Sequence, residues 1–321
     1  MTLTWFWLLA GVDKIMDFYI KKVKMKKIVL LSVAALLSIA VSAENFVVKP
    51  NGWKAGDSRS YDCVTVSNNG EIDRNDMSLA VSSVAKDKYL IDYKSVSDSS
   101  ENQYKRLKMM LGDSIAEAMN NFVYKVSLSK DGEFGHFENY KDVAGLFGGG
   151  LFESVMTSMI GTSQEDAENK IVPEIKDICW YMNKKFDSKK ENVFKRNFTE
   201  KITVFKDVEV KVRAGAQEGK VTFVMTADLS EEIVFAASEK ALKDVMNEMA
   251  KSMGVQPSMF DAKIKETLDE LKKQENSIAI KETVVFDEKT GWLVSYDRVV
   301  ETTSAAEGKT IVSSRRSITA K

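Results

Sequence analysis

The chain has 321 residues, with 46 basic and 47 acidic side chains, a formal net charge of −1, two cysteines and one histidine. Its lysines and arginines are interleaved with aspartates and glutamates, whereas nucleic-acid binding depends on clustered positive charge, so no nucleic-acid partner is expected. The single histidine, His136, also excludes a metal site built from several histidines.

The chain begins with two segments that we do not expect in the mature fold. We interpret residues 1–24 as an upstream extension of the reading frame, with Met25 as the true initiator; a short amphipathic leader is the alternative. Residues 25–43 have the layout of a signal peptide, because two lysines precede a twelve-residue apolar run and small residues end at Ala43. The run is shorter than the roughly 20 residues that cross a bilayer, which favours cleavage after Ala43 over a membrane anchor.

Residues 44–321 are therefore predicted to be an exported mature chain with no stable membrane span. Residues 1–43 carry six lysines and two aspartates, so the net charge of −1 for the whole chain becomes −5 for the remainder. Glu44 follows the predicted cut where a bacterial lipoprotein would have a cysteine, so no lipid attachment is expected. We expect a protein that is periplasmic or secreted, and long enough to form one large domain or two small ones.

The first half of the mature chain, about residues 44–186, opens with β-rich runs separated by turn residues. This alternation predicts an antiparallel meander over residues 58–67, 77–85 and 88–97. An apolar stripe predicts a helix over residues 100–122, with Ser100 and Gln103 as a capping box. A hairpin around Asp131-Gly132 follows, over residues 123–137.

Residues 138–186 are helix-like, with Thr162 and Glu165 as a second capping box and Pro173 as a predicted kink. Within them, residues 143–161 have Glu153 as their sole charge. A glycine triplet gives this segment backbone freedom, and its apolar side chains form a broad surface in which methionine adapts to irregular partners. Either a flexible lid over an apolar chamber or a buried core helix with a glycine hinge fits this pattern. The hinge would be Gly148, Gly149 and Gly150, and the candidate ligand contacts are Phe147, Leu151, Phe152, Val155, Met156 and Met159.

The second half, about residues 187–321, repeats the order of strands, helix and strands around a glycine turn. Strands are predicted over residues 200–214, 220–229 and 231–238, then a helix closed by Gly254 and a second helix with a stripe from Phe260 to Leu271. The chain ends in strands around Lys289-Thr290-Gly291, a turn that matches Asp131-Gly132 in position, and in a last run over residues 309–319. Both an ancient duplication and a shared architecture explain the likeness of the halves.

Cys63 and Cys179 both lie in the predicted mature chain. An oxidising compartment would allow a disulfide between them, and closing so long a loop would stabilise the fold by about 4–5 kcal/mol on the chain-entropy estimate. Two buried thiols are the alternative, because a disulfide needs Cα atoms within about 7 Å.

A signal peptide, long strands joined by hairpins such as "DEKTGWLVSY", and intervening helices together give a layout that resembles a known group. It is similar to the exported antiparallel half-barrel proteins of the bacterial envelope, among them the periplasmic lipoprotein carriers. The resemblance covers the mature chain but carries no diagnostic motif. It implies a strongly curved antiparallel sheet with helices on one face, enclosing an apolar chamber for acyl chains, and it assigns no binding residue.

Catalytic patterns are weak in this sequence. Gly112-Asp113-Ser114 continues as "GDSI", close to the GDSL hydrolase motif, but that family needs its serine at a strand-to-helix turn and a histidine late in the chain. Ser114 falls within a helical pattern, and no histidine follows His136. No phosphate-binding glycine loop, Cys-x-x-Cys pair or calcium loop is present, so we expect no cofactor and no metal.

The sequence thus predicts an α+β fold, with two pseudo-repeats as one interpretation, and an exported, non-enzymatic binding or envelope-assembly protein. Its expected ligand is apolar, such as a lipid or acyl chain, and an envelope protein is a further candidate partner. The alternatives are a module that binds a protein through its sheet face and, less favoured, a hydrolase.

Overall fold

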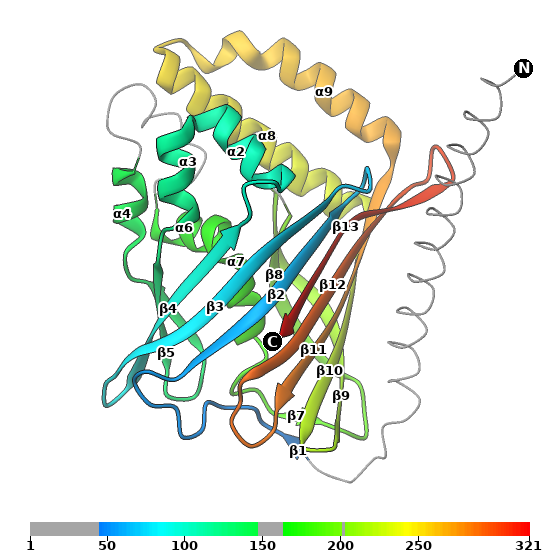
Figure 1. Cartoon of the computed structure of the whole chain (residues 1–321). Coiled ribbons are helices and arrows are strands. Elements are labelled where there is room, and N and C mark those ends of the chain that lie inside the picture. Colours follow the sequence, from blue (N-terminus) through cyan, green and yellow to red (C-terminus); the bar gives the residue numbers. More distant parts are fainter. Residues whose placement is uncertain (1–44, 147–162, 201–202) are drawn as a thin grey trace, which may run out of the picture. The chain divides into compact units, whose positions relative to one another are not determined.

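The computed structural model of the protein describes residues 45–146, 163–200 and 203–321. Within these ranges, eleven strands form one antiparallel sheet (Figure 1). They are β2 (Ser58–Ser67), β3 (Ile72–Val84), β4 (Lys88–Ser97), β5 (Tyr124–Ser129), β6 (Phe134–Phe137), β8 (Asn192–Glu200), β9 (Thr203–Gln217), β10 (Lys220–Leu229), β11 (Asn276–Asp287), β12 (Leu293–Ser304) and β13 (Lys309–Ala320). The short strands β1 (Asn45–Phe46) and β7 (Phe186–Asp187) pair separately.

In the described ranges, helices separate the strands at three places along the chain. They are α2 (Asn102–Leu111), α3 (Asp113–Asn120), α4 (Tyr140–Gly145), α6 (Gln164–Ile171), α7 (Pro173–Cys179), α8 (Glu231–Met253), the 3₁₀ turn η1 (Pro257–Phe260) and α9 (Asp261–Gln274). The predicted mixed α and β class, dominated by an antiparallel sheet, is confirmed. In the part of the chain that the structure describes, no helix is both long enough and apolar enough to span a bilayer.

The sheet does not close, and its strand order is β6-β5-β4-β3-β2-β13-β12-β11-β10-β9-β8. The chain runs from β2 outward to the edge at β6, then crosses to the other edge at β8 and runs back to β13, which pairs with β2. The sheet is therefore built from two meanders that cross it in the same direction.

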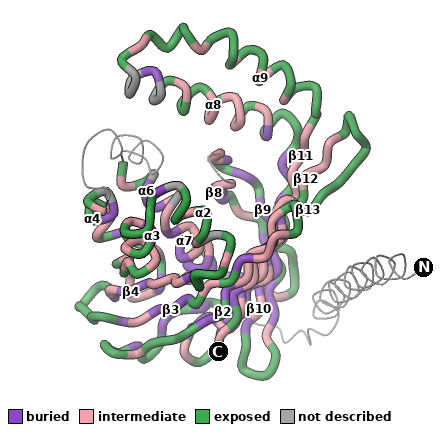
Figure 2. The backbone as a smooth tube through the Cα atoms, turned by 45° about the horizontal axis from the view of Figure 1, so that its top comes forward, coloured by how far each residue is buried: buried purple, intermediate pink, exposed green. Residues whose placement is uncertain are grey.

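Alternating side chains place the core along the sheet, as the burial colours of Figure 2 show. In β2, Tyr61 and Cys63 are buried while their neighbours Ser60 and Asp62 are exposed, as expected when successive residues of a strand point to opposite faces. The largest fully buried side chains are mostly aromatic: Tyr61, Tyr181, Tyr296, Phe137, Phe186, Phe198, Phe205, Phe223 and Phe286.

The segment after β1 connects the two turns that the sequence predicted to be equivalent. The backbone N–H of Asn51 and the indole N–H of Trp53 both donate to the carbonyl of Thr290, at 3.1 and 2.8 Å. Gly291 has a positive φ of 72°, and a Cβ there would lie 2.1 Å from the Lys49 carbonyl oxygen, so only glycine fits this close approach. On the other turn, the Lys49 ammonium pairs with Asp131 at 2.7 Å.

Several strand predictions match the structure closely: residues 58–67, 88–97 and 220–229 are β2, β4 and β10. The strand predicted over residues 231–238 is wrong, because these residues form the first two turns of α8. The apolar run within these residues fits both the two-residue period of a strand and the 3.6-residue period of a helix. The acidic residues Glu231 and Glu232 favour a helix N-terminus, and the Val234 N–H donates to the Ser230 carbonyl as in a helix.

The helix predicted over residues 100–122 is divided into α2 and α3 at Gly112. Gly112 has φ of 79°, which a right-handed helix cannot contain. The predicted capping box at Ser100 is also wrong, since Glu101 is the N-cap and no side chain caps the helix. Pro173 does not kink a helix either; it opens α7, where its missing N–H costs nothing.

Candidate functional site

A pocket lies between helices α8 and α9, which together form a helical hairpin. Gly254, with φ of 66°, ends α8, and Glu275 ends α9 in the left-handed conformation. α8 contacts β9 and β11, whereas α9 contacts α8 and η1 and has no buried residue. The groove between them is therefore walled by one helix that rests on the sheet and one that does not.

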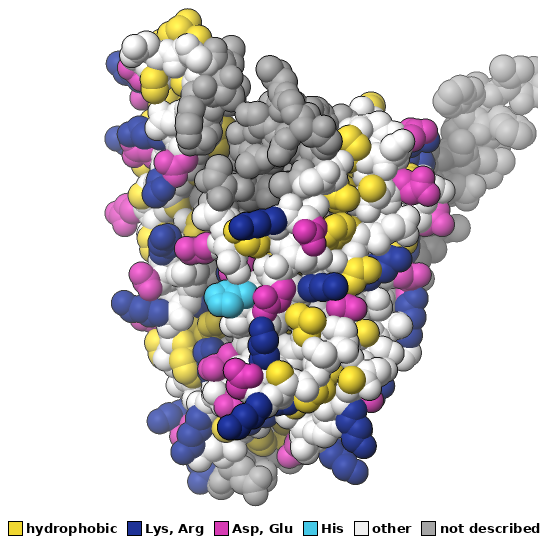
Figure 3. All heavy atoms as spheres, turned by 90° about the vertical axis from the view of Figure 1, so that its left-hand side faces the viewer, with side chains coloured by type: hydrophobic (Ala, Val, Ile, Leu, Met, Phe, Trp, Pro, Cys, Tyr) yellow, Lys and Arg dark blue, Asp and Glu magenta, His cyan; other side chains and the backbone are white. Residues whose placement is uncertain are grey.

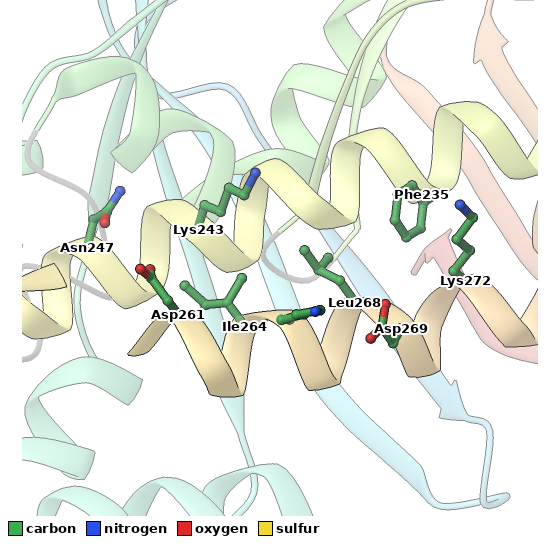
Figure 4. A pocket seen from close by; sticks show the side chains of 9 residues that line it. Phe235, Lys243, Asn247, Asp261, Ile264, Leu268, Asp269 and Lys272 are labelled. Carbon is green, nitrogen blue, oxygen red and sulfur yellow. The ribbon is translucent and has the colours of Figure 1, made fainter. Parts of the chain in front are cut away.

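Apolar side chains form the floor of this groove and charged side chains form its rim (Figure 4). Ile264 and Leu268 point from α9 toward α8, and Phe235 points from α8 toward α9. The rim consists of Lys243, Asn247, Asp261, Lys265, Asp269 and Lys272. The groove volume is about 520 Å³, within the range of about 300–1,000 Å³ that is usual for small-molecule sites.

The rim has three lysines and two aspartates, so it carries an excess of one positive charge. Lys243 is paired with Glu239 on its own helix at 2.6 Å. Lys265 and Lys272 form no ion pair with any described residue. Two ammonium groups thus flank an apolar floor, an arrangement that suits an apolar molecule with an anionic end.

A second polar cluster is buried beneath α7 and centres on Glu282 of β11, whose side chain is 0% exposed. Its carboxylate accepts hydrogen bonds from the Tyr181 hydroxyl at 2.7 Å and the Tyr296 hydroxyl at 3.1 Å. The Arg196 guanidinium donates to it at 2.7 Å. A buried carboxylate is tolerated only when it is paired and hydrogen-bonded, and Glu282 meets both conditions.

The same cluster connects α7 to the sheet. Asp177 of α7 accepts from Arg196 of β8 at 2.5 Å and from Arg298 of β12 at 2.8 Å. Arg298 also donates to Glu200, whose pKa is raised by burial even though the Arg298 charge acts in the opposite direction. This cluster therefore holds α7 against strands β8 and β12 of the sheet.

The positions of the charged residues along the strands could have predicted this cluster, although periodicity alone did not. Glu282 lies in phase with Ile280, Val284 and Phe286, all of which are buried. Arg196 is likewise in phase with the core residue Phe198. A charged residue at a core-facing strand position predicts a buried partner of opposite charge.

The two cysteines are buried free thiols in the structure, with no bond between them. Burial raises the pKa of Cys63 to about 11 and that of Cys179 to about 12. The thiolate is the reactive form, so neither residue is placed to act as a nucleophile.

The polar residues weighed for hydrolysis lie on different elements of the fold. His136 lies on β6 at the surface (Figure 3), 69% exposed, with Nδ1 3.7 Å from Glu168. Ser114 is the second residue of α3, and no hydrogen bond joins it to His136 among the described residues. Within the described ranges no group of three or more histidine, cysteine or acidic residues could hold a metal ion.

The candidate ligand contacts from the glycine-rich segment, Phe147 through Met159, lie outside the described residues, as do Gly148, Gly149 and Gly150. Only the start of that segment is described, and there Val143 of α4 is buried. The groove was not predicted as a site. The stripe from Phe260 to Leu271 was its sequence signal, but the sequence did not indicate which surface the stripe faced.

Comparison with known proteins gives no family. No family model matches the chain, and no curated protein matches it significantly. One solved structure, described as a conserved protein of unknown function with a hot dog fold from Alicyclobacillus acidocaldarius, is 8% identical over 84% of this chain and 81% of that one. Its TM-score is 0.12, a value too low to carry an argument about fold or function.

Proposed function

We propose that this is an exported, non-enzymatic protein that binds an apolar ligand with an anionic end, such as a fatty acid or a lipid. The observation that carries the proposal is the groove between α8 and α9, where Phe235, Ile264 and Leu268 offer apolar contacts. Lys265 and Lys272 supply positive charge without an ion-pair partner among the described residues. Burial of apolar surface would provide affinity, and the lysines would orient the head group.

We further propose that the open sheet curves into a half-barrel with its helices on one face. The two meanders support an origin by duplication, because each has three strands, then a pair of helices, then further strands. In the first the helical pair is α2 and α3, and in the second it is α8 and α9. If the halves arose by duplication, the helical pair that forms the groove is the second copy of a pair that both halves contain.

Export remains part of the proposal. It rests on the sequence of residues 25–43, in which two lysines, an apolar run and small residues ending at Ala43 follow the layout of a signal peptide. Expression from Met25 in a bacterial host, followed by N-terminal sequencing, should give Glu44 as the first residue in the periplasm or medium. A membrane-bound product that retains residues 28–43 would contradict it.

A titration with a dansyl-labelled long-chain fatty acid tests the ligand proposal. Ile264→Asp or Leu268→Asp should weaken binding at least about tenfold, because each places a carboxylate on the groove floor. Val245→Asp is the matched control, since Val245 is an exposed residue of α8 that does not line the groove. Equal losses in all three variants, with equal melting temperatures, would refute the groove as the site.

The head-group contact can be tested separately. Lys265→Ala with Lys272→Ala should weaken binding of the fatty acid but not of the fatty alcohol of equal length. Lys263→Ala is the control, because Lys263 pairs with Glu266 at 2.8 Å and does not line the groove. An equal effect on the acid and the alcohol would remove the lysines from the binding model.

The glycine-rich segment adds a proposal about exchange. If residues 143–161 gate the ligand, Gly148→Pro or Gly149→Pro should slow stopped-flow exchange of the bound fatty acid, because proline fixes φ near −65°. Phe152→Asp should weaken equilibrium binding. Unchanged rates and affinity in variants of matched thermal stability would eliminate the lid.

A protein partner is the second candidate function, and the exposed side of the helical hairpin favours it. Met259 is 70% exposed, Ile233 and Val245 are also exposed, and α9 has no buried residue. On this proposal these exposed apolar side chains would provide the contacts with the partner. If this candidate is correct, Met259→Asp should abolish capture of the partner and leave fatty-acid binding unchanged.

A further inference from the structure

Strand β13 extends past its neighbour β2 and leaves a free edge. Residues Lys309–Val312 pair with β12, from Ser304 to Glu301, but β2 begins to pair with β13 only at Ser314. Lys309 to Ser313 therefore face no strand on their other side within the described part of the chain. Figure 1 shows this β12–β13 hairpin projecting beyond the end of β2.

The free edge is also exposed and apolar. Every residue from 305 to 312 is exposed, and Ile311 and Val312 are 41% and 45% exposed. Consecutive strand residues point to opposite faces, so Ile311 and Val312 place one exposed apolar side chain on each face of the hairpin. Ile311 pairs with Thr302, which is two residues from the buried Val300 and shares its sheet face. The apolar face of the sheet thus continues past the core.

The edge strand β6 provides a contrast. There the backbone N–H of Phe137 donates to the buried side chain of Glu168 at 3.1 Å, so a side chain from α6 occupies a position that another strand could use. Proteins protect edge strands with such devices because unpaired backbone groups invite further pairing. The projecting end of β13 has Lys309 at its start and a bulge at its base, where the register with β12 shifts by one residue at Ser313. Between these two positions, Thr310, Ile311 and Val312 have no blocking side chain from another described element.

We propose that the projecting end of β13 pairs antiparallel with the same segment of a second copy of this chain. A two-fold axis at Ile311 would use the whole free edge: Lys309 would face Ser313, Thr310 would face Val312, and Ile311 would face its own copy. No like charges face each other in this register, whereas an axis at Lys309 would oppose two lysines. In this arrangement the sheets of two copies would join into one continuous sheet across the dimer.

The size of the edge sets the strength of this association. Five residues span about 17 Å of strand, and the pairing would bury far less than the roughly 1,000 Å² that a stable interface requires. The dimer is therefore weak and forms at high protein concentration.

Cysteine crosslinking tests the register directly. The native cysteines are buried, so a new surface cysteine reports on the edge alone. Under mild oxidation, Ile311→Cys should form a disulfide-linked dimer, because the two copies face each other. Lys309→Cys alone should not, since its copies would lie about 14 Å apart along the strands. A mixture of Lys309→Cys with Ser313→Cys should crosslink.

Sedimentation equilibrium at high concentration provides the second measurement. The wild type should show a concentration-dependent rise in mass, and Ile311→Lys should remain monomeric with an unchanged melting temperature, because two like charges would then be opposed. A strictly monomeric wild type, equal crosslinking of Ile311→Cys and Lys309→Cys, or association unaffected by Ile311→Lys would each overturn the proposal. Strand addition by a different polypeptide to a monomeric wild type would also overturn it.

Discussion

Replacing Arg196 by Met should cost about 3–5 kcal/mol of unfolding free energy, because it leaves buried carboxylates without their partner. Arg196 is 2% exposed and donates to Glu282 at 2.7 Å and to Asp177 at 2.5 Å. After the change, Glu282 would keep two tyrosine hydroxyls, and the nearest remaining cation would be the Arg298 Nε at 3.7 Å. Total stabilities are about 5–15 kcal/mol, so the loss would be a large fraction of the whole.

Arg106 provides a matched control for this change. It also contacts two carboxylates, Glu71 at 2.7 Å and Asp73 at 2.8 Å, but it is 47% exposed. Arg106→Met should therefore cost no more than about 1 kcal/mol. Urea unfolding followed by circular dichroism gives both values, and the slope with denaturant should stay constant.

A double-mutant cycle separates the lost pairing from the lost packing. Glu282→Gln should restore part of the stability in the Arg196→Met background, because no carboxylate then remains unpaired at that position. A stability loss for Arg196→Met no larger than that for Arg106→Met, or a further loss when Glu282→Gln is added to Arg196→Met, would contradict this prediction.

Three further predictions concern other parts of the fold. The thiols of Cys63 and Cys179 should resist Ellman's reagent in the native protein, and both should react after unfolding; a rapid native reaction would show that they are not buried. Burial raises their pKa values to about 11 and about 12, whereas unfolded thiols ionise near pH 8.5. The stability should therefore be fully present below about pH 8.5 and fall as pH rises toward those values, which urea midpoints at pH 8 and pH 10 would check. Trp53→Ala should cost about 3–5 kcal/mol in urea unfolding, because it removes a buried ring that stacks on Trp292 with centroids 4.0 Å apart and donates to Thr290; a loss below about 1 kcal/mol would show that the segment does not secure the turn. His136→Ala should leave fatty-acid binding intact and change stability by less than about 0.5 kcal/mol, and loss of binding in a folded variant would contradict the exposed position of this histidine.

Most strands could be predicted because apolar and polar residues alternate along a strand that has one buried face. β2, β4 and β10 follow this rule and were predicted with their observed limits. The start of α8 could not be resolved in the same way, because the apolar run from Ile233 to Ala237 has no alternation and the helical pattern becomes clear only farther along. Local sequence also did not show that Gly112 divides a helix, since a single glycine inside a helical pattern is often tolerated.

The groove and the buried cluster could not be predicted for a different reason. Both depend on which elements lie beside each other, and Arg196 and Glu282 are 86 residues apart in the chain. The stripe on α9 was visible, but its partner, Phe235, lies in a segment that the sequence predicted to be a strand. Assigning that segment to a strand therefore concealed one wall of the site.

Native mass spectrometry of the mature protein purified from its own cell tests the central claim most directly. We expect an additional mass that corresponds to an acyl amphiphile on the wild type, and its absence from a folded Leu268→Asp variant. A wild type that carries no ligand even after incubation with fatty acid, or a ligand that remains bound to Leu268→Asp, would contradict binding in the groove.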